Sequence, residues 1–270
     1  QVEIETWDAS AGFFKCTEDK AIPANRPGFD RIPPLANPIA GPVSVEGAER
    51  GDVLVVCIHE IEVADYSWVA IGPKRGPLGE STRWPELSGE YTTKIFPHQL
   101  GPSGTTKDGV LQFNETISWP ITPFIGTIGV APDREVRTSI DGQGPWGGNL
   151  DIRDAAPGNR ILLPVYHEGA LFYLGDLHAS QGDTEYTGTA AETCGTVRLH
   201  FELIKQKHLP FLRIEKPSSI IATRAARPLE VAVDNATKDL ISWLIDDYGF
   251  TPTDAYCLVS TCPGFRINVY

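Results

Sequence analysis

Glycine and proline interrupt this chain so frequently that long helices are excluded over most of its length. The 270 residues include 26 glycines and 22 prolines, against roughly 12% for the two together in average proteins. Glycine destabilises helix interiors, and proline breaks them. The excess therefore predicts many turns and short strands, with an irregular segment over residues 1–42, where six of the prolines lie.

Apolar runs and alternation after residue 43 predict a mainly β body, of sandwich or barrel type. Val53–Ile58 and Ile121–Val130 are apolar runs typical of buried strands. Residues 197–203 alternate apolar and polar side chains, which predicts a strand buried on one face. The Gly-, Pro-, Ser- and Thr-rich stretch 72–108 is expected to form long loops.

Other local patterns predict a hairpin and a helical C-terminus. His167-Glu168-Gly169 separates two apolar runs, which predicts a β-hairpin with its turn at the glycine. Helical spacing of apolar residues ends at Tyr248, and Gly249 suits a helix C-terminus. Thr251-Pro252 is typical of the start of a second helix, which would run to Cys262, and residues 266–270 are expected to form a closing strand. We therefore predict a β body over 1–205 that carries the site, and a small α/β segment over 206–270 packed on it.

Charge and hydropathy exclude several classes of partner. The chain has 23 Lys+Arg against 35 Asp+Glu, a formal charge of −12. Nucleic-acid binding depends on cations that neutralise phosphates, so neither nucleic acid nor an anionic membrane is an expected partner. No apolar run reaches the ~18–20 residues of a transmembrane helix.

The cysteines predict a reduced, cytoplasmic protein. Five cysteines are present and none forms a CxxC pair, which excludes zinc-finger and dithiol redox motifs. The first residues are charged and lack the apolar core of a signal peptide. The sequence begins with Gln1 and contains no methionine, so the removal of a leader stays open.

Acidic residues and histidine converge between Gly144 and Glu192. Three pairs at i, i+2 spacing would each share one face of an extended segment. The pairs are Asn149 with Asp151, Asp176 with His178, and Asp183 with Glu185. Carboxylates with an imidazole suit a divalent metal ion such as zinc, with one position left for a water whose pKa falls to about 7. The alternative interpretation is structural, because Asp and Asn beside Gly are common turn formers.

These stretches resemble the acetamidase/formamidase family. The similarity is carried by residues 123–132, by Gly-Gly-Asn-Leu-Asp at 147–151, by 163–165 with 169–172, and by Gly-Asp-Leu-His-Ala-Ser-Gln-Gly-Asp at 175–183. It implies a β-rich fold with a C-terminal α/β part and a homodimer or larger assembly. The implied reaction is hydrolysis of a small-molecule amide, a short linear carboxamide, to a carboxylic acid and ammonia.

The resemblance also implies roles for individual residues. It favours Asp151, Asp176 and His178 as ligands of a divalent metal ion, with zinc as the preferred ion. Glu192 is the first choice for proton transfer, with Asp183 and Glu185 as alternatives. The residues expected to bind substrate are Asn149, Gln181 and Trp146, the first two by hydrogen bonds to the amide or its oxyanion.

Two departures from the family pattern keep other functions open. Trp146 stands where many members have histidine, and Thr184 stands where glycine is common. They leave open a lyase, isomerase or cyclase that acts on a biosynthetic intermediate in the same pocket. A third hypothesis is a non-catalytic protein that binds a metal or a small ligand.

Overall fold

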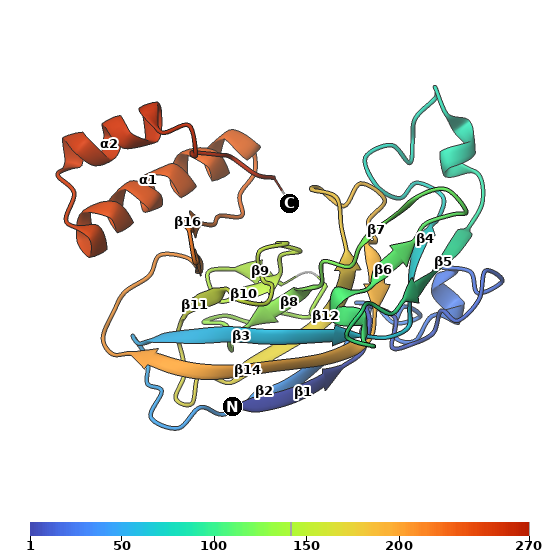
Figure 1. The fold of residues 1–270 in the computed structure, drawn as a ribbon, viewed down its shortest axis with the longest axis horizontal. Coiled ribbons are helices and arrows are strands. Elements are labelled where there is room, and N and C mark those ends of the chain that lie inside the picture. Colours follow the sequence, from blue (N-terminus) through green and yellow to red (C-terminus); the bar gives the residue numbers. More distant parts are fainter. Residues whose placement is uncertain (141, 270) are drawn as a thin grey trace.

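The computed structural model describes residues 1–140 and 142–269, which form two antiparallel β-sheets and two C-terminal helices (Figure 1). The sheets pack face to face, and the two helices lie together outside them (Figure 1). Three short 3-10 helices also form, η1 (Pro23–Asn25), η2 (Pro85–Ser88) and η3 (Thr106–Asp108). The predicted mainly β fold with a small C-terminal α/β part is confirmed.

The first sheet contains six strands within the described residues, in the order β1-β14-β3-β11-β15-β16. Its long central pair, β3 and β14, runs side by side across the molecule (Figure 1). The strands are β1 (Val2–Thr6), β14 (Gly195–Ile204), β3 (Val53–Val63), β11 (Arg160–Pro164), β15 (Arg213–Lys216) and β16 (Ser219–Ala222).

The second sheet follows the order β7-β6-β5-β4-β13-β12-β8-β10-β9 in the described part of the chain, and β2 also pairs with β12. Its centre is β12, which pairs with β8 on one side and β13 on the other. The strands are β7 (Ser118–Pro120), β6 (Val110–Gln112), β5 (Thr92–Gln99), β4 (Tyr66–Ile71), β13 (Ala191–Thr193), β12 (Phe172–Ser180), β8 (Phe124–Gly129), β10 (Gly147–Asn149), β9 (Gln143–Gly144) and β2 (Ile39–Val43).

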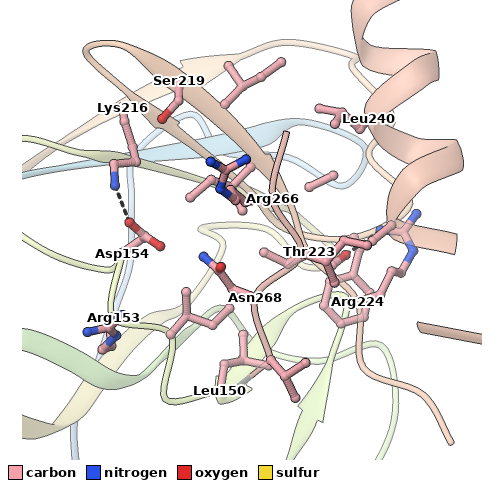
Figure 2. A pocket seen from close by; sticks show the side chains of 18 of the residues that line it. Leu150, Arg153, Asp154, Lys216, Ser219, Thr223, Arg224, Leu240, Arg266 and Asn268 are labelled. Carbon is pink, nitrogen blue, oxygen red and sulfur yellow. Dashed lines mark hydrogen bonds and ion pairs between the residues drawn. The ribbon is translucent and has the colours of Figure 1, made fainter. Parts of the chain in front are cut away.

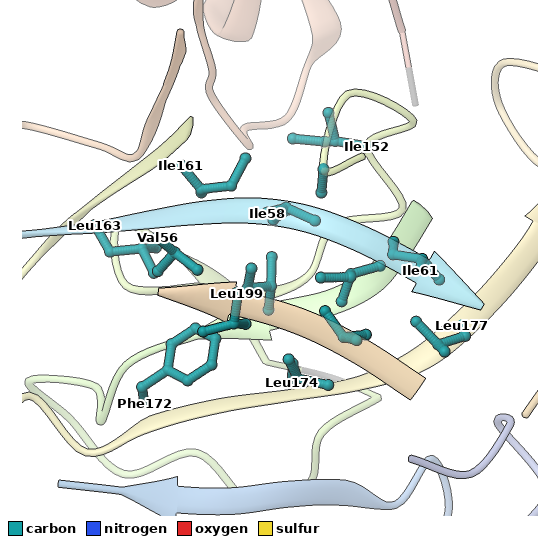
Figure 3. Close-up of a cluster of buried hydrophobic side chains, with 14 of the residues drawn as sticks. Val56, Ile58, Ile61, Ile152, Ile161, Leu163, Phe172, Leu174, Leu177 and Leu199 are labelled. Carbon is teal, nitrogen blue, oxygen red and sulfur yellow. The ribbon is translucent and has the colours of Figure 1, made fainter. Parts of the chain in front are cut away.

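The main hydrophobic core fills the space between the sheets (Figure 3). Val56 and Ile58 of β3 meet Phe172 and Leu174 of β12, and all four side chains are fully buried. Each such side chain contributes about 1.5–3 kcal/mol through removal from water. The core therefore holds β12, which carries Asp176 and His178, firmly in place.

The two helices end and begin as the sequence predicts. Helix α1 (Leu229–Tyr248) ends at Gly249, whose φ of 72° is the left-handed conformation of a C-terminal cap. Helix α2 (Pro252–Thr261) begins after Thr251, whose hydroxyl accepts the backbone N–H of Asp254. Among the described residues, neither helix combines the length and apolarity that crossing a bilayer requires.

Three local predictions are wrong. The runs on either side of His167-Glu168-Gly169 form β11 and β12, which belong to different sheets, so the turn is a crossover and not a hairpin. The supposed loop 72–108 contains β5, a regular partner of β4. Residues 266–269 form no strand, and Tyr270 lies outside the described residues. Because β15 pairs with β11, the C-terminal segment extends the sheet of the body; the boundary near residue 205 stays a prediction.

Candidate functional site

The site begins on β12, where the strand changes the face that it presents to the core. Leu174 and Leu177 are three residues apart, yet both are buried in the main core. Between them Asp176 has a φ of 59°, in the left-handed region that non-glycine residues rarely adopt. Because of this turn of the backbone, Asp176 and His178 lie together away from the core, with the His178 ring edge-on to Phe124 at 4.9 Å.

Asp151 joins them from the segment that follows β10. Its backbone N–H donates to the carbonyl of Gly126 at 3.1 Å, and its φ is 50°. A side chain at Gly126 would approach Asp151 Oδ1 and His178 Cε1 to 2.9 Å. The absence of a side chain at this position therefore leaves the space into which Asp151 and His178 project.

Two glutamates complete the arrangement from the other side. Glu192 of β13 lies opposite His178 in the strand register, and its Oε2 is 3.4 Å from His178 Nε2. Its Oε1 accepts the backbone N–H of Ala190 at 3.0 Å. Glu185, in the loop before β13, places a carboxylate oxygen within 4.8 Å of ligand atoms of His178 and Glu192. The two glutamates thus adjoin His178, as Asp151 and Asp176 do.

We call the set Asp151, Asp176, His178, Glu185 and Glu192 the acid cluster. Ligand atoms of Asp151, Asp176 and His178 all lie within 4.8 Å of one another, and His178 Nε2 is 3.4 Å from Asp176 Oδ1. Ligand atoms bound to one tetrahedral ion at about 2.0–2.2 Å lie roughly 3.3–3.6 Å apart. Asp176 Oδ1 and Glu192 Oε2 thus each lie from His178 Nε2 at the separation of two atoms that share one cation.

Several oxygens and nitrogens of the acid cluster are buried without a hydrogen-bond partner among the described residues. They are Asp151 Oδ1, Asp176 Oδ1, Glu192 Oε2 and both ring nitrogens of His178. Buried polar atoms are ordinarily paired, because each unpaired one costs about 1–3 kcal/mol. A divalent cation would satisfy several of them at once, and the oxygen and nitrogen donors match zinc. The residues present therefore fit the metal that the sequence suggests.

The electrostatics are those of a site short of positive charge. Burial and then the charge of Glu192 raise the pKa of Glu185 to about 8, and burial raises the pKa of Glu192 to about 7. Burial and the charge of Asp176 raise the pKa of Asp151 well above its usual value. Although burial acts to lower the pKa of His178, the charges of Glu192 and Asp176 raise it well above 6.5. The folded chain concentrates negative charge here and binds protons to compensate for it.

One residue of the site was missed by the sequence analysis. Asn37, from the irregular N-terminal segment, donates through Nδ2 to Asn149 Oδ1 at 2.7 Å and to Asp176 Oδ2 at 3.2 Å. Thr127 donates to Asn149 Oδ1 at 2.5 Å. Asn37 holds a φ of 60°, a conformation that asparagine tolerates better than most residues. In the sequence, only its place beside Pro38 marks Asn37 as unusual. No local pattern connects it with Asn149 and Asp176, which lie 112 and 139 positions away.

The other predicted residues fall into two groups. Asn149 and Gln181 border the acid cluster, since Asn149 Nδ2 lies 3.4 Å from Asp151 Oδ2 and Gln181 Nε2 donates to the Asp151 carbonyl at 3.0 Å. Asp183 is half-exposed and forms an ion pair with Arg153 at 2.8 Å, so it does not share a face with Glu185. Trp146 is buried in the main core.

A large cavity of about 1340 Å³ lies beside this region, between the body and the C-terminal segment (Figure 2). Leu150 and Arg153, which flank Asp151 in the sequence, line one side, and Arg266 and Asn268 of the C-terminal tail line another (Figure 2). Its wall combines apolar side chains with several arginines and lysines. The cavity therefore begins within a few residues of the acid cluster.

The two packed sheets and the acid cluster define a β-sandwich protein with a candidate metal centre, and comparison with known proteins places it in a family. Residues 139–268 match the model of the acetamidase/formamidase family. The crystal structure of an acetamidase from Bacillus halodurans is 33% identical, with a TM-score of 0.83 over 96% of this chain and 80% of that one. An acetamidase structure from Yersinia enterocolitica is 31% identical, with a TM-score of 0.81 over 96% and 76%. The chain belongs to the acetamidase/formamidase family.

A curated relative is more distant and longer. The acetamidase of Mycolicibacterium smegmatis is 28% identical over 219 residues, which cover 62% of this chain and 53% of that protein. The chain spans about half the length of the curated relatives that it matches. The comparisons thus show the family and the fold.

Proposed function

We propose that this protein is an amidase that hydrolyses short linear carboxamides to a carboxylic acid and ammonia. The observation that carries the proposal is the acid cluster, whose unpaired buried atoms converge in a chain of the acetamidase/formamidase family. Relatives are named acetamidase and formamidase, which supports small carboxamides as the substrate class. A cytoplasmic location and a homodimer or larger homo-oligomer belong to the same proposal.

Asp151, Asp176 and His178 would hold a divalent metal ion, with zinc as the preferred ion. Such an ion would supply Lewis-acid chemistry by polarising the carbonyl of the amide. Asn37 and Thr127 orient Asp176 by hydrogen bonds to its Oδ2 at 3.2 and 3.4 Å, so that Oδ1 faces His178. Outer partners of this kind fix the direction of metal ligands.

Glu192 is the residue that we assign to proton transfer. Hydrolysis of an amide adds water to the carbonyl carbon, breaks the C–N bond and requires a proton on the departing nitrogen. Burial raises the pKa of Glu192 to about 7, so its carboxyl can both hold and release a proton near neutral pH. Glu185, whose pKa is raised to about 8, is positioned to exchange protons with it. Asp183 receives no such role, because its carboxylate is paired with Arg153.

Gln181 is suited to bind the amide group. Its Nε2 is engaged by the Asp151 carbonyl at 3.0 Å, while its Oε1 is buried and has no hydrogen-bond partner among the described residues. That oxygen would accept an N–H of the substrate, which an ester of the same shape lacks. Gln181 therefore favours amides over esters.

Replacement of His178 tests the proposal. We expect His178→Ala to lower kcat/KM for acetamide and formamide about 10³-fold or more, since loss of several kcal/mol of transition-state stabilisation has this effect. The matched control is His98→Ala, because His98 is also buried but both its ring nitrogens are paired, with the Ala64 carbonyl and the Ser67 hydroxyl. Per folded molecule, His98→Ala should retain turnover.

The same assay decides between the proposal and its alternatives. Ammonia release from a panel of small amides supports hydrolysis. Conversion of a substrate without ammonia would instead indicate a lyase, isomerase or cyclase. Stoichiometric metal with no turnover on any amide would indicate a binding protein, and turnover that survives His178→Ala would remove His178 from the mechanism.

A further inference from the structure

The outer face of the six-stranded sheet carries a second group of metal-ligating side chains. Cys57 of β3 lies directly opposite His200 of β14 in the strand register. Glu202 is two residues further along β14, and side chains two residues apart share one face of a strand. Ligand atoms of Cys57, His200 and Glu202 all lie within 4.8 Å of one another. Two neighbouring strands thus present sulfur, nitrogen and oxygen donors to one point.

The separations of these donors are close to the edges of a coordination tetrahedron. Cys57 Sγ is 3.7 Å from Glu202 Oε1, and His200 Nε2 is 3.1 Å from the same oxygen. Ligand atoms held at 2.0–2.3 Å by one tetrahedral ion lie roughly 3.3–3.7 Å apart. Cys57 is buried, whereas the side chains of His200 and Glu202 are 36% and 48% exposed and free to adjust around it.

A set of outer contacts fixes two of the three ligands. The Nδ1 of His200 is 2.6 Å from Nε2 of His59, and the two rings stack at 4.7 Å. If Nε2 of His200 ligates a metal, Nδ1 carries the ring proton and donates a hydrogen bond to Nε2 of His59. On the other side, Arg160 Nη2 donates to Glu202 Oε2 at 2.8 Å, which leaves Oε1 directed at Cys57 and His200. Ligating histidines and carboxylates commonly have such outer partners.

We propose that Cys57, His200 and Glu202 form a second metal site, specific for a transition-metal ion of the zinc type. A thiolate and an imidazole select borderline-soft ions over magnesium and calcium, which prefer oxygen ligands throughout. Three protein ligands leave a fourth tetrahedral position for water. On binding, the Cys57 thiol forms the metal–sulfur bond and releases its proton to solvent.

The site is distinct from the acid cluster and independent of the proposed amidase activity. It lies on β3 and β14 of the first sheet, whereas the acid cluster is built on β12 and β13 of the second and contains no cysteine. Its sulfur ligand therefore provides a signature that the acid cluster cannot produce. His59 also lines the large cavity, so the site is reachable from solvent.

Cobalt titration of the full chain tests the proposal. Co²⁺ replaces zinc in such sites, and a thiolate ligand gives a cobalt–sulfur charge-transfer band in the near ultraviolet. We expect this band to saturate within two equivalents at the intensity of one thiolate-bound cobalt per chain, because the acid cluster takes up cobalt as well. The band should vanish in Cys57→Ser and persist in Cys16→Ser, which alters an exposed free cysteine. His178→Ala should also keep it.

Two variants of exposed residues test the proposal even if Cys57→Ser folds poorly. Glu202→Gln and His59→Ala should weaken cobalt binding, the second by about 10–100-fold, as expected for loss of an outer partner. A band that survives Cys57→Ser, or cobalt affinity unchanged in both other variants, would overturn the proposal. The absence of any thiolate band would show that the group is only a hydrogen-bonded network around Arg160.

Discussion

Two buried carboxylates in this molecule are compensated in opposite ways. Asp239 of helix α1 is 4% exposed and Asp176 of the acid cluster is 3% exposed. Asp239 accepts from Arg213 Nη2 at 2.6 Å and Nε at 3.3 Å, and from Arg224 Nη1 at 3.2 Å. It therefore has two guanidinium groups for one negative charge. Asp176 lies among three other carboxylic acids, with the single imidazole of His178.

The charge of Asp239 is compensated within the fold, whereas we propose that the charge of Asp176 is compensated by a bound ligand. Around Asp239 every charge finds a partner within the chain, which ties helix α1 to β15. In the acid cluster the chain provides donors for one oxygen of Asp176 and leaves the other unpaired. Since an unpaired buried charge is costly, this region is stable only with bound protons or a bound cation.

The largest expected effect concerns stability after removal of one carboxylate from each region. Asp239→Asn leaves the buried guanidinium of Arg213 and the partly buried one of Arg224 without a counter-charge and should lower the free energy of unfolding by about 3–5 kcal/mol. Asp151→Asn, in metal-free protein at pH 8, should leave it unchanged or raise it, because burial and Asp176 already disfavour the charged form of Asp151. Urea unfolding of chelator-treated protein measures both.

A control on the same helix sharpens this result. Asp234 pairs with Lys238 at 2.5 Å, and both are exposed, so Asp234→Asn should cost at most about 0.5 kcal/mol. If Asp151→Asn destabilised the metal-free protein as strongly as Asp239→Asn, the contrast between the two regions would be wrong.

The second effect is stabilisation by metal. Zinc at 100 times its Kd should add about 2.7 kcal/mol to the free energy of unfolding, which raises Tm by roughly 5–10 °C for a chain of this size. Thermal unfolding with and without zinc measures the shift. His178→Ala should lose the part contributed by the acid cluster and keep the part contributed by the second metal site, and Cys57→Ser should do the reverse. A shift that is equal in both variants and the parent chain would mean that zinc acts elsewhere.

The stability of the metal-free protein should also depend on pH. The folded-state pKa values of Glu185 and Glu192 are raised to about 8 and about 7 from the usual 4.5, and that of His178 is raised as well. The folded state therefore binds more protons than the unfolded state across this range. Its stability should be greatest near pH 5 and decline towards pH 8, as the extra protons of the folded state are lost.

Zinc should reverse this trend, because metal binding requires deprotonated ligands. Glu185→Gln should flatten the decline in the metal-free protein. Denaturant unfolding at several pH values checks both statements, and stability that rises between pH 5 and pH 8 without metal would contradict the assignment.

The sequence predicts the fold class and most of the acid cluster because both depend on local patterns. The density of glycine and proline, together with short apolar runs, was enough to predict a mainly β body. Asp176 and His178, two residues apart, do share a face as predicted. Helix ends at Gly249 and Thr251 were predictable because capping depends on neighbouring residues. The hairpin at residues 167–169 was wrong because a turn does not determine whether its strands enter the same sheet.

Other parts of the site depend on tertiary packing, which the local pattern does not contain. Asn37 reaches Asp176 only because the irregular N-terminal segment lies over the second sheet. Asp183 and Glu185 have the spacing of a shared face, but Glu185 has a φ of 43°, which ends the alternation that the prediction assumed. Trp146 occupies a position that the family pattern suggested for binding, yet it packs in the core.

Gly126 has a consequence for how such proteins diversify. Because Gly126 has no Cβ, Asp151 and His178 can lie close to the β8 backbone. An added methyl group would clash with both of these candidate ligands at once. Substitutions of the ligands change the chemistry of the centre, whereas substitution of this glycine would displace the ligands from one another's reach. A Cβ there would also approach the backbone carbonyl oxygen of Asp176 to 2.8 Å, so the strand geometry favours glycine at this position whether or not an ion is bound.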